Sequence, residues 1–280
     1  MKVLVTGYAG QLGWDVVRLL ESRGTECRGV DQADFNLTDA EAVMAYVKDY
    51  APDVIVHCAA YTAVDRAEAE PEICIAVNGM GTLNMVRAAL AVNAKLVYIS
   101  TDYVFPGTGE IPWKEDDAYG PLNVYGQSKV QGEMAVQSLM TRFFILRTSW
   151  VFGAHGKNFV RTMLRLGAEK EELRVVGDQV GSPTYTQDLA RVICDMIPTE
   201  KYGVYHVRNE GFISWAEFAQ MIMEKRMLPC RIIPVTTEEY ETAAKRPRNS
   251  RMNGGKLNAA GFGPMPSVED ALNRYLAEIE

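Results

Sequence analysis

The segment NVYGQSK, residues 123 to 129, places a tyrosine and a lysine four positions apart. On a helix this spacing brings Tyr125 and Lys129 onto one face. A free phenol is a poor acid at neutral pH, whereas an ammonium about 4 Å away favours phenolate by about 4 kcal/mol at an effective dielectric constant of about 20. Such pairs often do no more than cover a helix face. Other parts of the chain must therefore decide whether Tyr125 is a proton donor.

An apolar run ends directly before three polar side chains. The segment YISTDYVF places Ser100, Thr101 and Asp102 at the end of this run, upstream of the Tyr-Lys pair. The carboxyl ends of parallel strands meet at one edge of a sheet, so we expect these groups beside the helix that carries Tyr125. A hydroxyl such as Thr101 can polarise a carbonyl oxygen, and a positioned acid contributes about 10²–10⁴ in rate. The predicted catalytic residues are therefore Tyr125, Lys129 and Thr101.

The first predicted strand ends in a glycine-rich turn, TGYAGQLG, with Gly7, Gly10 and Gly13 in the pattern G-x-x-G-x-x-G before an apolar-periodic helix. Glycine allows a tight turn here and lets the backbone approach a pyrophosphate at the positive end of the helix. Asp31 ends the next strand at the distance expected of a ribose-binding carboxylate. The turn alone is weak evidence, because similar turns occur without a ligand. Its position and Asp31 together predict dinucleotide binding.

The same carboxylate bears on the choice of dinucleotide. Asp31 should accept hydrogen bonds from a ribose diol and repel a 2′-phosphate, so NADH should be usable. Arg28 is the nearby cation, and the sequence does not give its direction. The choice between NADPH and NADH therefore stays open.

Apolar, β-branched runs alternate with amphipathic segments through the first half of the chain. The runs KVLVT, ECRGVD, DVIVHC, KLVYIS and FFILRT are separated by predicted helices at 11–22, 38–50, roughly 66–92 and 124–140. This alternation predicts an α/β fold with a Rossmann-type doubly wound parallel sheet. Beyond residue 150 the pattern loosens, with predicted helices at 158–169, 185–197, 214–226 and 268–279 and short strands near 173–176 and 204–207.

The change of pattern near residue 150 predicts two unequal domains. We expect residues 1–150 to form the dinucleotide-binding Rossmann domain and residues 151–280 to form mainly a smaller C-terminal substrate-binding lobe. The boundary is expected to be discontinuous, with parts of 184–208 returning to the first domain. No repeat or low-complexity linker separates the two halves. They should therefore pack closely, with a cleft where such folds bind ligands.

Composition excludes several classes of function. A chain of 280 residues with 48% hydrophobic residues can bury a sizeable core, and a net charge of -7 argues against nucleic-acid binding. Five scattered cysteines and three distant histidines match neither a disulfide framework nor a familiar zinc site. The N-terminus lacks the pattern of a signal peptide, and no run is apolar for the length of a membrane span. We therefore expect a cytoplasmic protein without a membrane partner.

Seven segments, spread from residue 10 to about 253, resemble one enzyme family. They are GQLGW, AAYTAVDRAE, STDYVFPG, PLNVYGQSK, LRTSWVFG, DQVGSPTYT and RPRNSRMN. In this order they are similar to the signature segments of the dTDP-4-dehydrorhamnose reductases, which belong to the extended short-chain dehydrogenases/reductases. The resemblance implies reduction of the C4 ketone of dTDP-4-dehydro-L-rhamnose to dTDP-L-rhamnose, with NADPH or NADH as cofactor. It also implies a dTDP-sugar as substrate, a role in surface polysaccharide biosynthesis and, as one option, a homodimer.

The resemblance also implies roles for individual residues. By matching position, the residues that would line the dinucleotide, besides Gly7, Tyr125 and Lys129, are Gly10, Gln11, Leu12, Asp31, Asn36, Leu37, Ala60, Tyr61, Thr62 and Ile99. Thr101, Asp102 and Trp150 would contact the sugar, although a tryptophan after a strand is as often plain core. Arg246 and Arg248 are predicted to hold a diphosphate, because guanidinium forks suit its oxygens. A solvated basic loop is the alternative for this segment.

Two other classes of protein share parts of this sequence pattern. A sugar-nucleotide epimerase or dehydratase shares the triad but keeps its NAD bound. The regulatory β subunit of methionine adenosyltransferase resembles the same reductases and binds dinucleotide without catalysis. Some reductases hold magnesium with glutamates at a dimer contact. The matching positions here are Asp15 and Gln187, and a neutral amide is a poorer ligand for a hard cation, so we predict no metal.

Overall fold

A central sheet of six parallel strands organises the computed structural model, which describes residues 1–280. The strand order is β10-β5-β4-β3-β1-β2. These strands are β1 (Lys2–Thr6), β2 (Glu26–Val30), β3 (Val54–His57), β4 (Lys95–Thr101), β5 (Phe143–Thr148) and β10 (Gly203–His206). The five strands expected from the first half of the chain are present, and the predicted doubly wound α/β sheet is confirmed. Chain order reverses between β1 and β3, the position at which such folds bind ligands.

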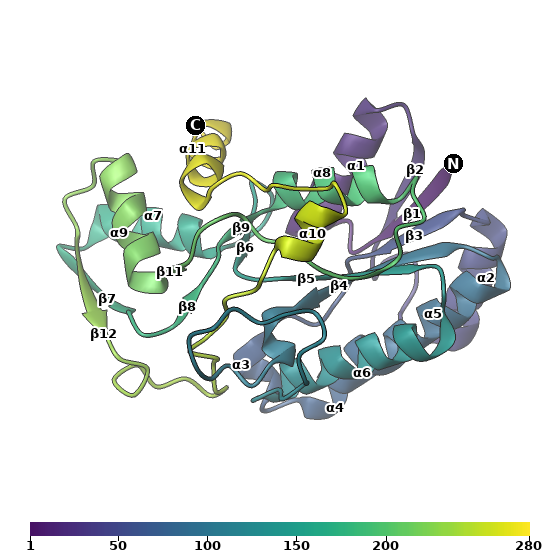
Figure 1. The fold of residues 1–280 in the computed structure, drawn as a ribbon, viewed down its shortest axis with the longest axis horizontal. Coiled ribbons are helices and arrows are strands. Elements are labelled where there is room, and N and C mark those ends of the chain that lie inside the picture. The colour runs from purple at the N-terminus through teal and green to yellow at the C-terminus, as the bar shows by residue number, and fades with distance from the viewer.

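Helices cover both faces of the sheet. In Figure 1, α1 (Gln11–Ser22) and α8 (Thr186–Met196) lie above it, whereas α2 (Ala40–Tyr50), α5 (Gly81–Ala91) and α6 (Val124–Leu139) lie below. Successive strand residues point to opposite faces, so Val3 and Val5 belong to one apolar cluster and Leu4 to the other. Burial on both faces explains why the strands are continuously apolar and not alternating.

The region 66–92, expected to be one amphipathic segment, is divided in the structure. It contains α3 (Val64–Ala67), α4 (Pro71–Ile75), a π-helical turn at Ala76–Met80 and α5. Pro71 at the first position of α4 suits a helix start, because proline lacks the N–H that a helix interior needs. Residues Pro71–Ala91 are long and apolar enough to cross a membrane by composition, but 56% of the most apolar window is buried in the fold. They form a core layer against α2 and α6.

A smaller lobe forms the left side of Figure 1. It pairs β7 (Glu172–Val176) with β12 (Arg231–Val235) in parallel and packs them with α7 (Phe159–Glu169), α9 (Trp215–Lys225) and α11 (Val268–Glu278). The predicted helices match these three and α8 to within one residue. The sequence did not predict β12, and Pro234 fits there because the strand pairs on one side only. The remaining elements are β6 (Val151–Phe152), β8 (Val180–Gly181), β9 (Thr184–Tyr185), β11 (Ile213–Ser214), α10 (Gly255–Ala259) and a 3-10 turn at Asp102–Val104.

Two elements of the second half belong to the layers of the large sheet. Strand β10 pairs with β5, and α8 packs on α1, so both lie outside the small lobe. Both elements fall within the segment 184–208. The segment therefore crosses between the two packing units, and the polypeptide passes between them more than once.

Candidate active site

A cleft of about 950 Å³ opens at the carboxyl ends of the parallel strands and reaches the small lobe. Its lining contains every residue selected from the sequence except two. The predicted residues that line the cleft are Gly7, Gly10, Gln11, Leu12, Asp31, Asn36, Leu37, Ala60, Tyr61, Thr62, Ile99, Thr101, Asp102, Tyr125, Lys129 and Trp150. The exceptions, Arg246 and Arg248, lie outside the lining. The fold thus brings the glycine turn and the Tyr-Lys pair to one cavity.

The glycine turn is packed too closely against neighbouring backbone to accept side chains. Gly7 has φ +71°, and a Cβ there would lie 2.6 Å from the Ala59 nitrogen. A Cβ on Gly13 would lie 2.3 Å from the Gly7 carbonyl oxygen. Gly10 precedes α1, and no side chain caps the first N–H groups of that helix. An uncapped helix start beside such a turn fits the pyrophosphate of a dinucleotide.

Asp31 follows β2 and is held against the glycine turn. Its Oδ2 accepts a hydrogen bond from the Ala9 N–H at 2.8 Å, and its Oδ1 accepts one from the Gln32 N–H at 2.8 Å. Arg28 points elsewhere, since its guanidinium lies 4.3 Å from the centre of the Tyr50 ring. The Arg28 side chain, whose direction the sequence left open, therefore points away from the cleft. Asp31, at the end of β2, is the charged residue there that lines the cleft.

Helix α6 presents Tyr125 and Lys129 to the cleft at the predicted i, i+4 spacing. The helix begins at Asn123, whose side chain accepts a hydrogen bond from the Gly126 N–H at 2.8 Å. Gly126 lets the first turn approach the neighbouring chain, because a Cβ there would lie 2.4 Å from the Tyr103 carbonyl oxygen. Tyr125 is thereby seated beside Tyr103, whose ring meets it edge-on at 5.7 Å.

The electrostatics of this pair differ from the sequence expectation. Burial raises the pKa of Tyr125, the Asp102 carboxylate adds to the increase, and a hydrogen bond with Thr101 opposes it. Lys129 donates from Nζ to the Ile99 carbonyl at 2.7 Å and lies 4.1 Å from the centre of the Tyr98 ring. The expectation that Lys129 lowers the pKa of Tyr125 is therefore wrong for this structure. Burial dominates the pKa of Tyr125, and the phenol is protonated at neutral pH.

Lys129 itself is strongly affected by burial. Its side chain is almost entirely enclosed, and the loss of water lowers its pKa to about 7, against an opposing effect of the Glu133 carboxylate. The lysine can therefore exchange a proton near neutral pH.

Two further polar groups lie beside the phenol at the end of β4. Thr101 donates from Oγ1 to Asp102 Oδ1 at 2.9 Å and accepts from the Tyr103 N–H at 3.2 Å. Asp102 is 2% exposed, burial raises its pKa to about 6, and its Oδ2 has no hydrogen-bond partner. Ser250, whose hydroxyl is also buried without a partner, lies close enough to oppose this increase in the pKa of Asp102.

Trp150 forms the wall of the cleft on the small-lobe side, together with a residue that the sequence reading missed. Its backbone has φ +53°, and its ring stacks on Trp215 at 3.7 Å between centroids. Gly181 packs beneath, since a Cβ there would lie 2.8 Å from the Trp150 ring. The capping box of α9, Ser214 with Glu217, marks a helix start in the sequence, but nothing local shows that Trp215 faces a cleft.

Arg246 and Arg248 are engaged in ion pairs outside the lining. Arg246 holds Asp65 with two bonds, at 2.6 and 3.0 Å, while Arg248 contacts Glu238 and lies 3.5 Å from Asp178. Arg246 lies near Tyr103, a residue of the lining. Burial raises the pKa of Tyr103, and the nearby Arg246 charge opposes this increase. The structure thus leaves their predicted contact with a diphosphate untested. No group of three or more metal-ligating side chains is present.

The parallel sheet, the glycine turn and the Tyr-Lys pair on α6 define a reductase-type fold of the extended short-chain dehydrogenase/reductase class. A family model described as the RmlD substrate binding domain matches residues 1–280, and the chain belongs to that family. The resemblance seen in the sequence is thereby confirmed.

Curated relatives and solved structures agree with this assignment. The chain is 43% identical to the spore coat polysaccharide biosynthesis protein SpsK of Bacillus subtilis, covering 99% of this chain and 97% of the relative. It is 38% identical to the dTDP-4-dehydrorhamnose reductase of Escherichia coli, covering 100% and 98%. A crystal structure of the Bacillus anthracis dTDP-4-dehydrorhamnose reductase in complex with NADP matches with TM-score 0.96 and 43% identity, covering 99% of both chains.

Proposed function

We propose that the chain is a dTDP-4-dehydrorhamnose reductase, which uses NADPH or NADH to convert dTDP-4-dehydro-L-rhamnose into dTDP-L-rhamnose. The observation that carries the proposal is the placement of Tyr125, Lys129 and Thr101 in the same cleft as the glycine turn. Full-length relatives named as this reductase support the substrate. The product would serve surface polysaccharide biosynthesis. A cytoplasmic location and a homodimer stay predictions.

The cofactor part of the cleft is formed by the glycine turn, Asp31 and the chain after β3. Gly10 precedes the uncapped start of α1, whose free N–H groups suit a pyrophosphate, and Asp31 offers its carboxylate to a ribose. The bound cofactor supplies a hydride to C4 of the sugar. Lys129, beside the Ile99 carbonyl, is placed to hold the hydroxyls of the nicotinamide ribose.

The proton comes from Tyr125. Hydride addition to C4 moves the carbonyl electron pair onto the oxygen, and the Tyr125 hydroxyl transfers its proton to that oxygen. Burial keeps the phenol protonated until then, and an alkoxide is a stronger base than a phenolate. Thr101 donates to the same oxygen, and the phenolate that remains is protonated again from solvent.

The substrate part of the cleft combines stacked rings with a buried acceptor. Trp150, supported by Trp215, offers an aromatic face to the sugar. Asp102 lies in the same part of the cleft and is proposed to contact the sugar. For Arg246 and Arg248 to hold the diphosphate, each must exchange its present carboxylate partner for phosphate oxygens.

The comparisons weaken both alternatives. Solved epimerases match this fold at 22% and 21% identity, which supports the fold alone, while a curated relative named as the reductase matches at 41% and a solved one at 43%. An intact Tyr125, Lys129 and Thr101 is unexpected in a subunit that only binds dinucleotide.

The test is a direct assay with purified protein, dTDP-4-dehydro-L-rhamnose and either NADPH or NADH, followed by nicotinamide absorbance. Turnover is expected, and the Tyr125→Phe variant should lose about 10²–10⁴ in kcat with cofactor binding nearly intact. A parent that binds dinucleotide but reduces no sugar would support the regulatory subunit. Purification with NAD that never exchanges would support the epimerase.

A further inference from the structure

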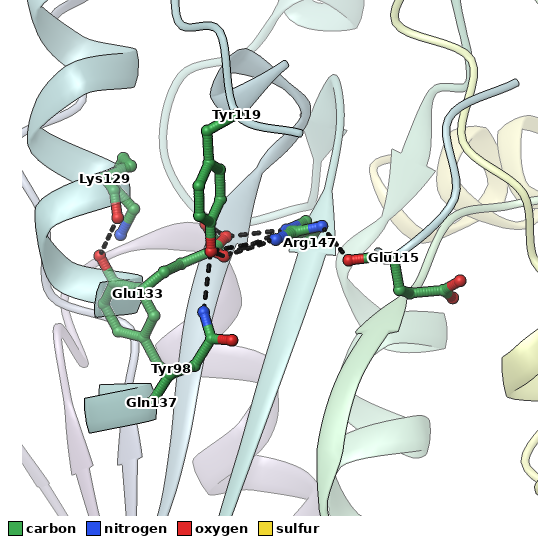
Figure 2. Close-up of polar contacts among 8 residues, drawn as sticks. Tyr98, Glu115, Tyr119, Lys129, Glu133, Gln137 and Arg147 are labelled. Atoms are coloured by element: carbon green, nitrogen blue, oxygen red, sulfur yellow. Dashed lines mark hydrogen bonds and ion pairs between the residues drawn. The ribbon is translucent and has the colours of Figure 1, made fainter. Parts of the chain in front are cut away.

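An ion pair is buried directly behind the catalytic residues. Glu133, on α6, is 0% exposed, and Arg147, on β5, is 2% exposed. Arg147 donates from Nε to Glu133 Oε1 at 2.9 Å and from Nη2 to Oε2 at 2.7 Å. Figure 2 shows this contact between the helix and the strand.

The remaining hydrogen-bonding capacity of the pair is also used. Glu133 accepts from Ser100 Oγ at 2.5 Å and from the Tyr119 hydroxyl at 2.7 Å. Arg147 also donates to the Glu115 carbonyl at 3.0 Å. Burying two charges is costly even with full pairing, and an apolar pair of similar volume is often as stable. Stability alone therefore gives no strong reason for the pair.

The pair contacts the catalytic residues through short stretches of chain. Ser100 is followed by Thr101 and preceded by Ile99, whose carbonyl accepts from Lys129. Glu133 lies one helical turn after Lys129 on α6. The pair thus joins the helix that carries Lys129 to the strand end that carries Thr101.

The charge that favours the Lys129 ammonium comes mainly from Glu133 of this pair. The direct hydrogen-bond partner of Lys129 is the neutral Ile99 carbonyl. The Glu133 carboxylate is the largest influence that favours the ammonium. Burial holds His57 and Cys58 neutral, with pKa values of about 3 and about 12. The titratable and charged groups on the elements packed around Lys129 are His57, Cys58, Cys74, Tyr98, Asp102, Tyr125, Glu133 and Arg147.

We propose that Glu133 and Arg147 are positioning residues for the reduction. Together they fix the position of Lys129 relative to Thr101 and set the charge of Lys129. Glu133 favours the ammonium, and Arg147 limits that effect while fixing the carboxylate to β5. The ammonium has three N–H donors and is the form that can hold the hydroxyls of a ribose. This inference rests on the proposed reductase function.

The charges predict opposite effects of two substitutions. Glu133→Gln keeps the size of the side chain but leaves the Arg147 cation unopposed, so Lys129 should lose its proton at lower pH. Arg147→Met leaves the Glu133 anion unopposed, so Lys129 should keep its proton to higher pH. In the pH profile of kcat, the alkaline limb should shift to lower pH in Glu133→Gln and to higher pH in Arg147→Met, each by on the order of one pH unit.

Matched controls separate this effect from damage to the fold. Glu169→Gln and Arg165→Met alter an exposed ion pair on α7 and should leave the limb in place. The double variant Glu133→Gln/Arg147→Met leaves neither charge of the pair, and its limb should fall between those of the single variants. A purely structural pair would lower activity in both single variants without moving the limb in opposite directions, and that result overturns the inference.

A second readout does not depend on turnover. The Lys129 ¹³Cε resonance, identified by its absence in Lys129→Met, can be titrated in cofactor-free protein. Its midpoint should fall in Glu133→Gln and rise in Arg147→Met. If the single variants do not fold, the double variant must show a midpoint below that of the parent, and an unchanged midpoint overturns the inference. A protein that reduces no sugar yet shows these shifts would contradict the proposed function while leaving the electrostatic coupling intact.

Discussion

Burial of the Lys129 ammonium should make the stability of the protein depend on pH in a defined direction. The pKa of Lys129 is about 7 in the folded protein, compared with 10.5 for a free lysine. Between these values the unfolded chain binds a proton that the folded protein does not, so the free energy of unfolding rises with pH. The rise from this residue is at most about 1.4 kcal/mol per pH unit.

Replacement of the lysine should remove this dependence. Below about pH 7 the folded parent carries the full cost of a buried ammonium, which is on the order of a few kcal/mol. Lys129→Met should therefore be more stable than the parent at about pH 6.5, and the advantage should shrink toward about pH 10. The variant would gain stability while losing turnover, as expected where a site is kept for function.

The assay is urea unfolding of parent and Lys129→Met at several pH values from about 6.5 to about 9.5, followed by circular dichroism. Lys48→Met, which alters an exposed lysine on α2, is the control and should follow the parent. Unfolding free energies of parent and Lys129→Met that run parallel across this range would refute the reasoning, because they would show that Lys129 keeps an ordinary pKa in the fold.

Three further substitutions test the cleft. Asp31→Ala should shift preference toward NADPH, because it removes a carboxylate that repels the 2′-phosphate; an unchanged ratio of the two kcat/KM values would contradict the placement of the ribose. Arg246→Ala should raise KM for the dTDP-sugar more than it lowers kcat and leave cofactor affinity unchanged, since a diphosphate contact exists in both ground and transition states. Kinetics equal to those of the parent would instead assign this segment to a solvated loop. Thr101→Val should lower kcat less than Tyr125→Phe does, because Tyr125 still supplies the proton; a larger loss would make Thr101 the main donor to the oxygen.

The sequence predicted the elements that local pattern controls. Apolar runs separated by helical periodicity predicted the parallel sheet, because strands buried on both faces must be continuously apolar. The glycine turn and Asp31 predicted a dinucleotide site from spacing between neighbouring elements. The i, i+4 spacing predicted that Tyr125 and Lys129 share a face of α6, since helix geometry alone determines this. In each case the residues involved lie on one element or on consecutive ones.

Tertiary structure decided the features that depend on distant residues. The direction of the Lys129 ammonium depends on the Ile99 carbonyl of β4, and the protonation of Tyr125 depends on burial from several elements. Trp215 reaches the cleft only because the small lobe folds back onto the first domain. Desolvation and ion pairing depend on which segments enclose a group. Spacing along the chain does not show which distant segments these are. The sequence therefore identified most of the groups that line the cleft, whereas the packed fold added Trp215, left Arg246 and Arg248 outside the lining, and determined the charge and partners of the rest.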